Sequence, residues 1–135
     1  MAGYSSRSLV DKLGIKPGTG VVVLGGPPDF PATLGPLPEG AGIRTRLSRG
    51  AAFIHQFARR KDDLAEAFPR LAQALADDGM VWISWPKKTS KIATDLTEDV
   101  VRSLGLPLGL VDVKVCAIDE TWSGLKFVRR KELRG

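Results

Sequence analysis

The sequence is poor in the two residue types that most often build metal sites and disulfides. Its 135 residues include one cysteine, Cys116, and one histidine, His55. A single cysteine excludes a disulfide within the chain, and one cysteine with one distant histidine lacks the ligand spacing of a zinc site. Both lie in apolar, strand-like segments, so we expect a buried histidine and an inert core thiol. We therefore predict no metal site and a reducing, cytoplasmic setting.

Long hydrophobic runs are absent as well. Residues 1–7 lack the apolar core of a secretory signal, and no run approaches the roughly 20 apolar residues of a membrane-spanning helix. We expect a soluble protein without a membrane partner. With 43% hydrophobic residues, the chain is rich enough to bury the core of a single domain, residues 1–135.

What the chain does have is an excess of positive charge. Its 20 Lys and Arg residues exceed its 15 Asp and Glu residues, which gives a formal net charge of +5. Such a balance favours acidic partners, such as nucleotides, nucleic acid or anionic surfaces. An inert basic surface explains the same balance, because net charge reports on solubility and weak association and not on a site.

Short β-branched and apolar runs alternate with helical patterns along the chain. The first run is continuously apolar, which is typical of a strand buried on both faces of a parallel sheet. The second alternates with arginines, as edge strands do. Strands are expected at Val21–Leu24, Ile43–Leu47, Ala52–Phe57, Met80–Trp85, Val111–Ile118 and Leu125–Val128.

Two helices stand out between these strands. The stronger one has a regular apolar stripe; Asp62 or Asp63 is expected to cap its start and Gly79 to end it. The other is expected to begin at a cap formed by Thr97. Shorter helical pieces at residues 9–13 and 29–34 and a frayed tail at 129–135 complete the pattern.

This alternation predicts one small Rossmann-like α/β domain with a mostly parallel sheet. With the strands numbered along the chain, the expected order is 2-1-3-4-6-5, which closes with a C-terminal antiparallel hairpin. The arrangement resembles a shortened class I methyltransferase-like sheet. The two clear helices would cover one face, and only a short helix and a Pro/Gly-rich segment would cover the other. A homodimer through that thinly covered face and a well-packed loop both remain open.

Five segments spread over most of the chain carry a family resemblance, namely Lys12–Gly18, Leu34–Pro38, Ser84–Lys88, Thr94–Arg102 and Val113–Phe127. Through them the chain resembles a family of small bacterial single-domain proteins of unknown function. The resemblance implies a bacterial protein but no activity, because the family has none to carry over.

Basic residues follow two of the expected strands. Since open α/β sheets bind ligands outside the carboxyl ends of their strands, these residues would meet at one sheet edge. Ammonium groups and hydroxyls there could hold a phosphate-like group, and arginines suit bidentate phosphate contacts. A solvated charged loop is the alternative. The candidate anion-binding residues are Arg59, Arg60, Lys87, Lys88, Thr89, Ser90 and Lys91.

Gly25 and Gly26 follow the first strand and are candidate cofactor contacts. The dinucleotide fingerprint needs a third glycine, which is missing here, and Pro27 and Pro28 remove amides that would bind phosphate. The acid expected after the second strand is replaced by Ser48-Arg49. A tight turn is therefore the favoured role of Gly25 and Gly26, and we predict no cofactor.

Three functions remain in competition. The first is a non-catalytic domain that binds an anionic ligand or partner at the basic sheet edge. The second is a reduced methyltransferase-like or nucleotide-using enzyme, although we find no catalytic set. The third is charge-driven nucleic-acid binding, with affinity that falls steeply with salt, through Arg44, Arg46, Arg49 and Arg129-Arg130-Lys131.

Overall fold

A computed structural model describes residues 8–134, and within them six strands form one sheet. The sequence-based strand order is confirmed. From one edge to the other the strands are β2 (Gly42–Arg44), β1 (Gly20–Leu24), β3 (Ala51–Phe57), β4 (Leu75–Pro86), β6 (Trp122–Arg129) and β5 (Leu110–Ala117).

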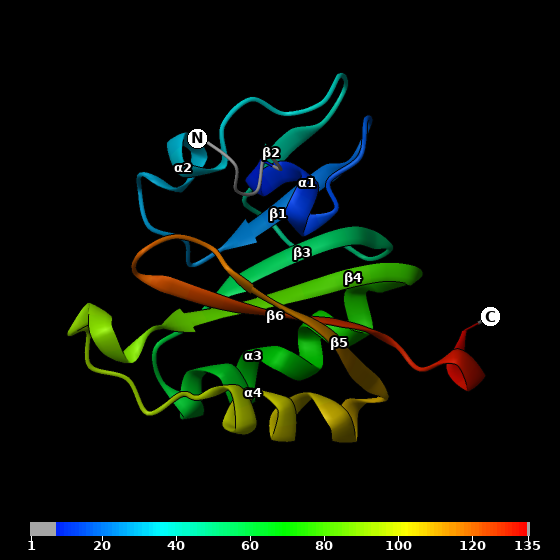
Figure 1. Ribbon diagram of the computed structural model, residues 1–135. Helices are drawn as coiled ribbons and strands as arrows, with labels where there is room; N and C mark the ends of the chain where they lie inside the picture. Colours follow the sequence, from blue (N-terminus) through cyan, green and yellow to red (C-terminus); the bar gives the residue numbers. More distant parts are fainter. Residues whose placement is uncertain (1–7, 135) are drawn as a thin grey trace.

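The first four strands of this order run parallel, and β6 runs antiparallel to both β4 and β5. The expected methyltransferase-like α/β fold is therefore confirmed, including its C-terminal antiparallel hairpin. Figure 1 shows α3 (Lys61–Ala74) and α4 (Glu98–Gly105) on one side of the sheet, and α1 (Leu9–Leu13) and α2 (Phe30–Leu34) on the other.

Each face of the sheet has its own apolar core. Under α3 and α4, side chains such as Ile54, Phe68 and Phe127 are fully buried. On the side of α1, Phe53 and Trp82 are also buried, in spite of the short helices there. Both faces are thus packed, as expected of a parallel sheet with apolar strands.

Several predicted boundaries are wrong. The second strand ends at Arg44 and not at Leu47, whereas the last one is longer than expected and starts at Trp122. The strong helix ends at Ala74, well before Gly79, because Leu75 already pairs with Ala51 as the first residue of β4. Gly79 has a different role: a Cβ atom there would lie 2.9 Å from the carbonyl oxygen of Ala51.

The cap of α3 also differs from the prediction. Neither Asp62 nor Asp63 caps the helix, whose N-cap residue, Arg60, makes no side-chain capping bond. Instead, the Lys61 amide donates a 2.7 Å hydrogen bond to Oδ1 of Asp95, a residue from a distant loop. The predicted cap of α4 is confirmed, since Thr97 Oγ1 accepts a hydrogen bond from the amide of Val100.

The predicted tail begins one residue too early, because Arg129 is the last residue of β6. Arg129 donates hydrogen bonds of 2.9 and 2.7 Å to the carbonyls of Ala72 and Leu75 at the end of α3. A cation there stabilises the exposed carbonyls and the negative end of the helix dipole. Lys131–Leu133 then form a short 3-10 turn, and the predicted fraying of Gly135 lies outside the described residues. Arg129 thus has a structural role.

Every helix in residues 8–134 is too short or too polar to cross a lipid bilayer.

Candidate functional site

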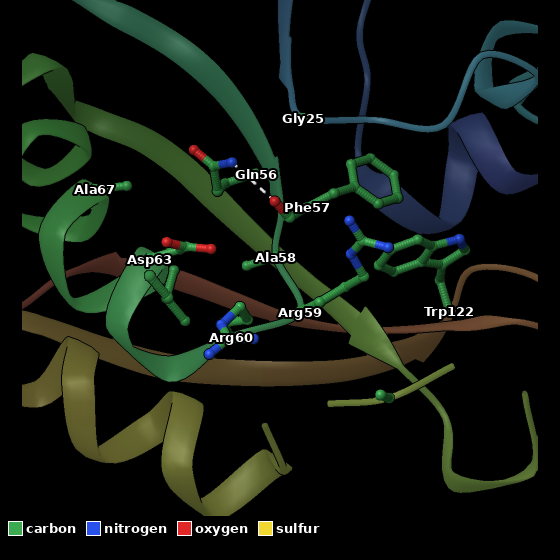
Figure 2. Close-up of a pocket in the computed structure, with 11 residues that line it drawn as sticks. Gly25, Gln56, Phe57, Ala58, Arg59, Arg60, Asp63, Ala67 and Trp122 are labelled. Atoms are coloured by element: carbon green, nitrogen blue, oxygen red, sulfur yellow. Dashed lines mark hydrogen bonds between the residues drawn. The ribbon is translucent and has the colours of Figure 1, made fainter. Parts of the chain in front are cut away.

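The order in which strands are added to the sheet reverses at β1. The strand after β1 lies on one side of it, and β3 lies on the other, so this is the topological switch point of the sheet. A cleft of about 400 Å³ opens at the carboxyl ends of these two strands. We call it the switch-point cleft, and Figure 2 shows its lining, which includes Gly25, Gln56, Arg59, Arg60, Asp63 and Trp122.

Gly25 forms a tight turn directly after β1 and lines the cleft. Its φ of +67° is favourable only for glycine, and a Cβ atom would lie 3.0 Å from the carbonyl oxygen of Phe57. The side-chain amide of Gln56 donates hydrogen bonds to the carbonyls of Leu24 and Phe57, 3.3 and 2.9 Å away. The floor of the cleft is thus a fixed junction of β1 and β3.

Arg59 and Arg60 follow β3 directly, and both side chains are exposed at the cleft. In the view of Figure 2, Arg59 extends toward Trp122, whereas Arg60 lies at the start of α3, near Asp63. The backbone around them is held from outside: Thr94 Oγ1 donates a 2.6 Å hydrogen bond to the carbonyl of Arg59. Together with the Asp95 cap of α3, this bond fixes the backbone from which both arginine side chains extend.

The charges of the cleft are mixed. Two guanidinium groups and one carboxylate, that of Asp63, line the same space. Beside them the rings of Phe57 and Trp122 meet edge to face, with centroids 5.0 Å apart. Such a lining combines an aromatic wall with partners for both an anionic and a cationic group of one ligand.

The lysine loop does not reach this cleft. Lys88–Ser90 form a 3-10 turn after β4, and none of the five candidates from Lys87 to Lys91 is among the described residues that line it. The Ser90 hydroxyl is used inside the loop, where it donates to the carbonyl of Lys87 and accepts from the amide of Ile92. The chain returns to the cleft only at Ala93. Anion binding by the lysine loop stays a prediction.

Gly26 lies on the other side of the turn, in a second hollow of about 370 Å³. We call this the apolar hollow. It shares Gly25 with the switch-point cleft and is lined by Pro28, Phe30, Ile43 and Thr45 among others. The position after β2, where the dinucleotide fingerprint expects an acid, holds Thr45, because the strand ends earlier than expected.

His55 does not contribute to the cleft, and its predicted burial is confirmed. Its ring is fully buried, stacks on Phe57 with centroids 4.3 Å apart, and shares a 2.6 Å hydrogen bond with Ser84 Oγ. Burial lowers the pKa of His55 to about 3, so the ring is neutral at physiological pH. Cys116 is buried as well, as predicted.

Sequence reasoning did not place Asp63, Trp122 or Thr94 at this cleft. Asp63 was assigned to a helix cap, although its place in the first turn after the β3 arginines is a usable signal. Trp122 comes from the far hairpin and Thr94 from a loop, and no local pattern connects them to β3. Among residues 8–134 no three His, Cys, Asp or Glu side chains gather in a way that could hold a metal ion.

No protein-family model matches this sequence, and neither does any curated protein, so the expected family resemblance is not confirmed at that level. Solved structures do match. A TehB-like SAM-dependent methyltransferase from Corynebacterium glutamicum superposes with a TM-score of 0.60 at 11% identity, over 90% of this chain and 85% of that one. The magnesium protoporphyrin IX methyltransferase of Synechocystis, solved with bound SAM, gives 0.54 at 13% identity, over 90% and 74%.

A structure of LepI with SAH and a substrate analogue matches with a TM-score of 0.51 at 15% identity. The match covers 90% of this chain but only 39% of LepI, so this chain spans well under half of that protein. At such identities the likeness establishes the methyltransferase-like fold.

Proposed function

We propose that this protein binds S-adenosylmethionine, or a small molecule with the same amino acid end, in the switch-point cleft. The observation that carries the proposal is the mixed charge of the cleft. A carboxylate would pair with Arg59 or Arg60, and an ammonium group with Asp63, which lines the same space. The solved neighbours support this ligand class, since their fold is shared and they are described as SAM-dependent or SAM-bound.

The residues present fit such a ligand at its amino acid end and its ring. Beyond Gly25, the apolar hollow offers Phe30 and Ile43 to a flat ring. The ribose end fits less closely, because Thr45 offers a hydroxyl where an acid would accept two hydrogen bonds. When bound, S-adenosylmethionine supplies an electrophilic methyl group. The chain's own part is to hold the amino acid end, with Arg59 or Arg60 on its carboxylate and Asp63 on its ammonium group.

A second candidate is non-catalytic binding of an anionic ligand in the same cleft. It is favoured by the two guanidinium groups, which outnumber the single carboxylate of Asp63. In this alternative the carboxylate of Asp63 weakens binding, because it repels an anionic ligand in the same cleft. The role of Asp63 therefore separates the two candidates.

The test is calorimetric titration of the wild type and of Asp63→Asn with S-adenosylmethionine, S-adenosylhomocysteine, AMP and inorganic phosphate. If the first proposal holds, Asp63→Asn weakens binding of both adenosyl ligands by about tenfold or more, the cost of a lost charged hydrogen bond. If the second holds, the same change strengthens binding of AMP. Asp62→Asn is the matched control, because Asp62 is exposed, adjacent and outside the cleft lining.

Two results would contradict the proposal. One is that no ligand of the panel binds. The other is that Asp62→Asn and Asp63→Asn change every affinity equally, which would mean a diffuse effect of net charge.

Four earlier expectations stay predictions. They are the membership in a bacterial family of unknown function, the cytoplasmic location, the homodimer and charge-driven nucleic-acid binding. For the last of these, Arg129 is already engaged at the end of α3.

A further inference from the structure

A cluster of three lysines lies away from the switch-point cleft, on the sheet face that carries α1. Lys126 of β6 and Lys114 of β5 are direct cross-strand partners in the antiparallel pair. Cβ atoms of such partners are about 5 Å apart, and like charges in this position destabilise a sheet. The charge of Lys16, which follows α1, also lowers the pKa of Lys126. We call these residues the lysine cluster.

Two members of the lysine cluster, Lys114 and Lys126, are held in place by contacts with the rest of the fold. The Lys114 ammonium group donates a 3.2 Å hydrogen bond to the carbonyl of Lys12, in the last turn of α1. Lys126 is half-buried, and its cross-strand neighbour in β4 is the fully buried Trp82. Burial, and then Lys114 and Lys16, lower the pKa of Lys126. Lys126 is thus held on a packed sheet face, whereas Lys16 is exposed.

Within residues 8–134, no ion pair includes Lys16, Lys114 or Lys126. On the opposite side of the sheet, Arg102 of α4 pairs with Asp112 of β5, in addition to Glu98 and Asp99 of its own helix. Lys126 is thus repelled by Lys114 and Lys16, and none of the three lysines has an ion-pair partner among the described residues.

We propose that the lysine cluster is a second anion site, which binds a phosphate-type dianion, either free or as the phosphoryl group of a small ligand. Three ammonium donors from three different segments can surround one tetrahedral anion, and lysines bind phosphate as point charges. A dianion removes the repulsion between Lys114 and Lys126, so binding stabilises the hairpin. None of the three lysines lines the switch-point cleft, and the proposal does not depend on the function of that cleft.

The test is thermal unfolding of the full chain in increasing inorganic phosphate, with sodium chloride at matched ionic strength as the reference. We expect phosphate at ten times its dissociation constant to raise Tm by about 4 °C above the chloride reference. AMP is a second arm. An equal shift with AMP that is lost when Lys114 and Lys126 are both changed to Gln identifies the phosphoryl group as the determinant, and a shift with phosphate alone identifies the free ion.

Variants locate the site. Lys114→Gln with Lys126→Gln is expected to raise Tm without phosphate, since the repulsion is gone, and to lose most of the phosphate-dependent shift. Arg59→Gln with Arg60→Gln is the matched control, with the same loss of two charges, and is expected to keep the shift. If the double variant does not fold, Lys114→Gln alone replaces it in this test, because Lys114 is exposed.

Three results would overturn the proposal. They are a phosphate shift no larger than that of chloride, a shift that survives in the Lys114 and Lys126 variant, and a shift that the arginine variant loses instead. Amide signals of the hairpin in an NMR titration with phosphate give an independent reading, because binding perturbs residues 114 and 126 and leaves those of the cleft unchanged.

Discussion

His55 links the stability of the fold to pH at the scale of a single residue. In the folded chain its pKa is lowered to about 3 from the ordinary value of 6.5, because the ring is buried. Below pH 6.5 the unfolded chain takes up a proton that the folded chain does not. Stability is therefore complete above pH 6.5 and falls by about 1.4 kcal/mol per pH unit as pH decreases toward 3.

Urea unfolding between pH 7 and pH 5 measures this slope. The range lies above the titration of most carboxylates, and His55 is the only histidine of the chain, so the slope is expected to belong to it. In His55→Gln the slope should become nearly flat, even though the variant loses stability at pH 7. An equally steep slope in the variant would show that another group is responsible.

Residue identity alone predicted part of the lining of the switch-point cleft. Gly25 was found because it follows an apolar strand, and Arg59 and Arg60 because they follow another. The role of Asp63 was not predicted, since an acid in a first helical turn is equally explained as a cap. Burial of His55 was predictable from its apolar neighbours, whereas its contact with Ser84 depends on the register of β3 against β4.

At the scale of elements, the loop before α4 holds the backbone of the two cleft arginines in place. Thr94 and Asp95 bond the backbone at Arg59 and Lys61, and Leu96 anchors the loop in the core beneath α3. We expect Thr94→Val and Asp95→Ala to cost about 1 kcal/mol each, as lost capping-type bonds do, and also to weaken the binding of S-adenosylhomocysteine. The cause is the freer backbone of the two arginines.

Thr97→Ala is the control for this prediction. It removes the cap of α4 at a similar cost of about 1 kcal/mol, but it touches nothing in the cleft. Urea unfolding and calorimetry on the three variants separate the effects. Thr94→Ser should restore both stability and affinity. If Thr97→Ala weakens binding as much as Thr94→Val does, general destabilisation explains the loss of affinity. The loop before α4 then has no positioning role for the two arginines.

The sequence predicted elements well where the signal is local. Thr97 precedes two acids and caps α4, whereas α3 is capped by Asp95, which is 34 residues beyond Lys61 and leaves no pattern near it. Gly79 looked like a helix terminator, but it is required by the close approach of β4 to the Ala51 carbonyl. Contacts between distant segments decided both cases.

At the scale of the whole molecule, strand order followed from the alternation of strands and helices, because right-handed crossovers leave few arrangements. The same reasoning placed a candidate site at the carboxyl edge of the parallel strands. It could not place the lysine loop, since the path from β4 to α4 is set by Thr94, Asp95 and the buried Leu96. The sequence also gave no signal for the lysine cluster, whose members come from three separate segments.

The central claim is that the switch-point cleft binds an adenosyl ligand through its mixed charges. The most direct test is an NMR titration of the full chain with S-adenosylhomocysteine, followed at the backbone amides. We expect saturable shifts at Gly25, at residues 56–60 and at Asp63, with weaker affinity and the same pattern in Asp63→Asn. Shifts that are absent, or confined to residues outside the cleft, would contradict the account.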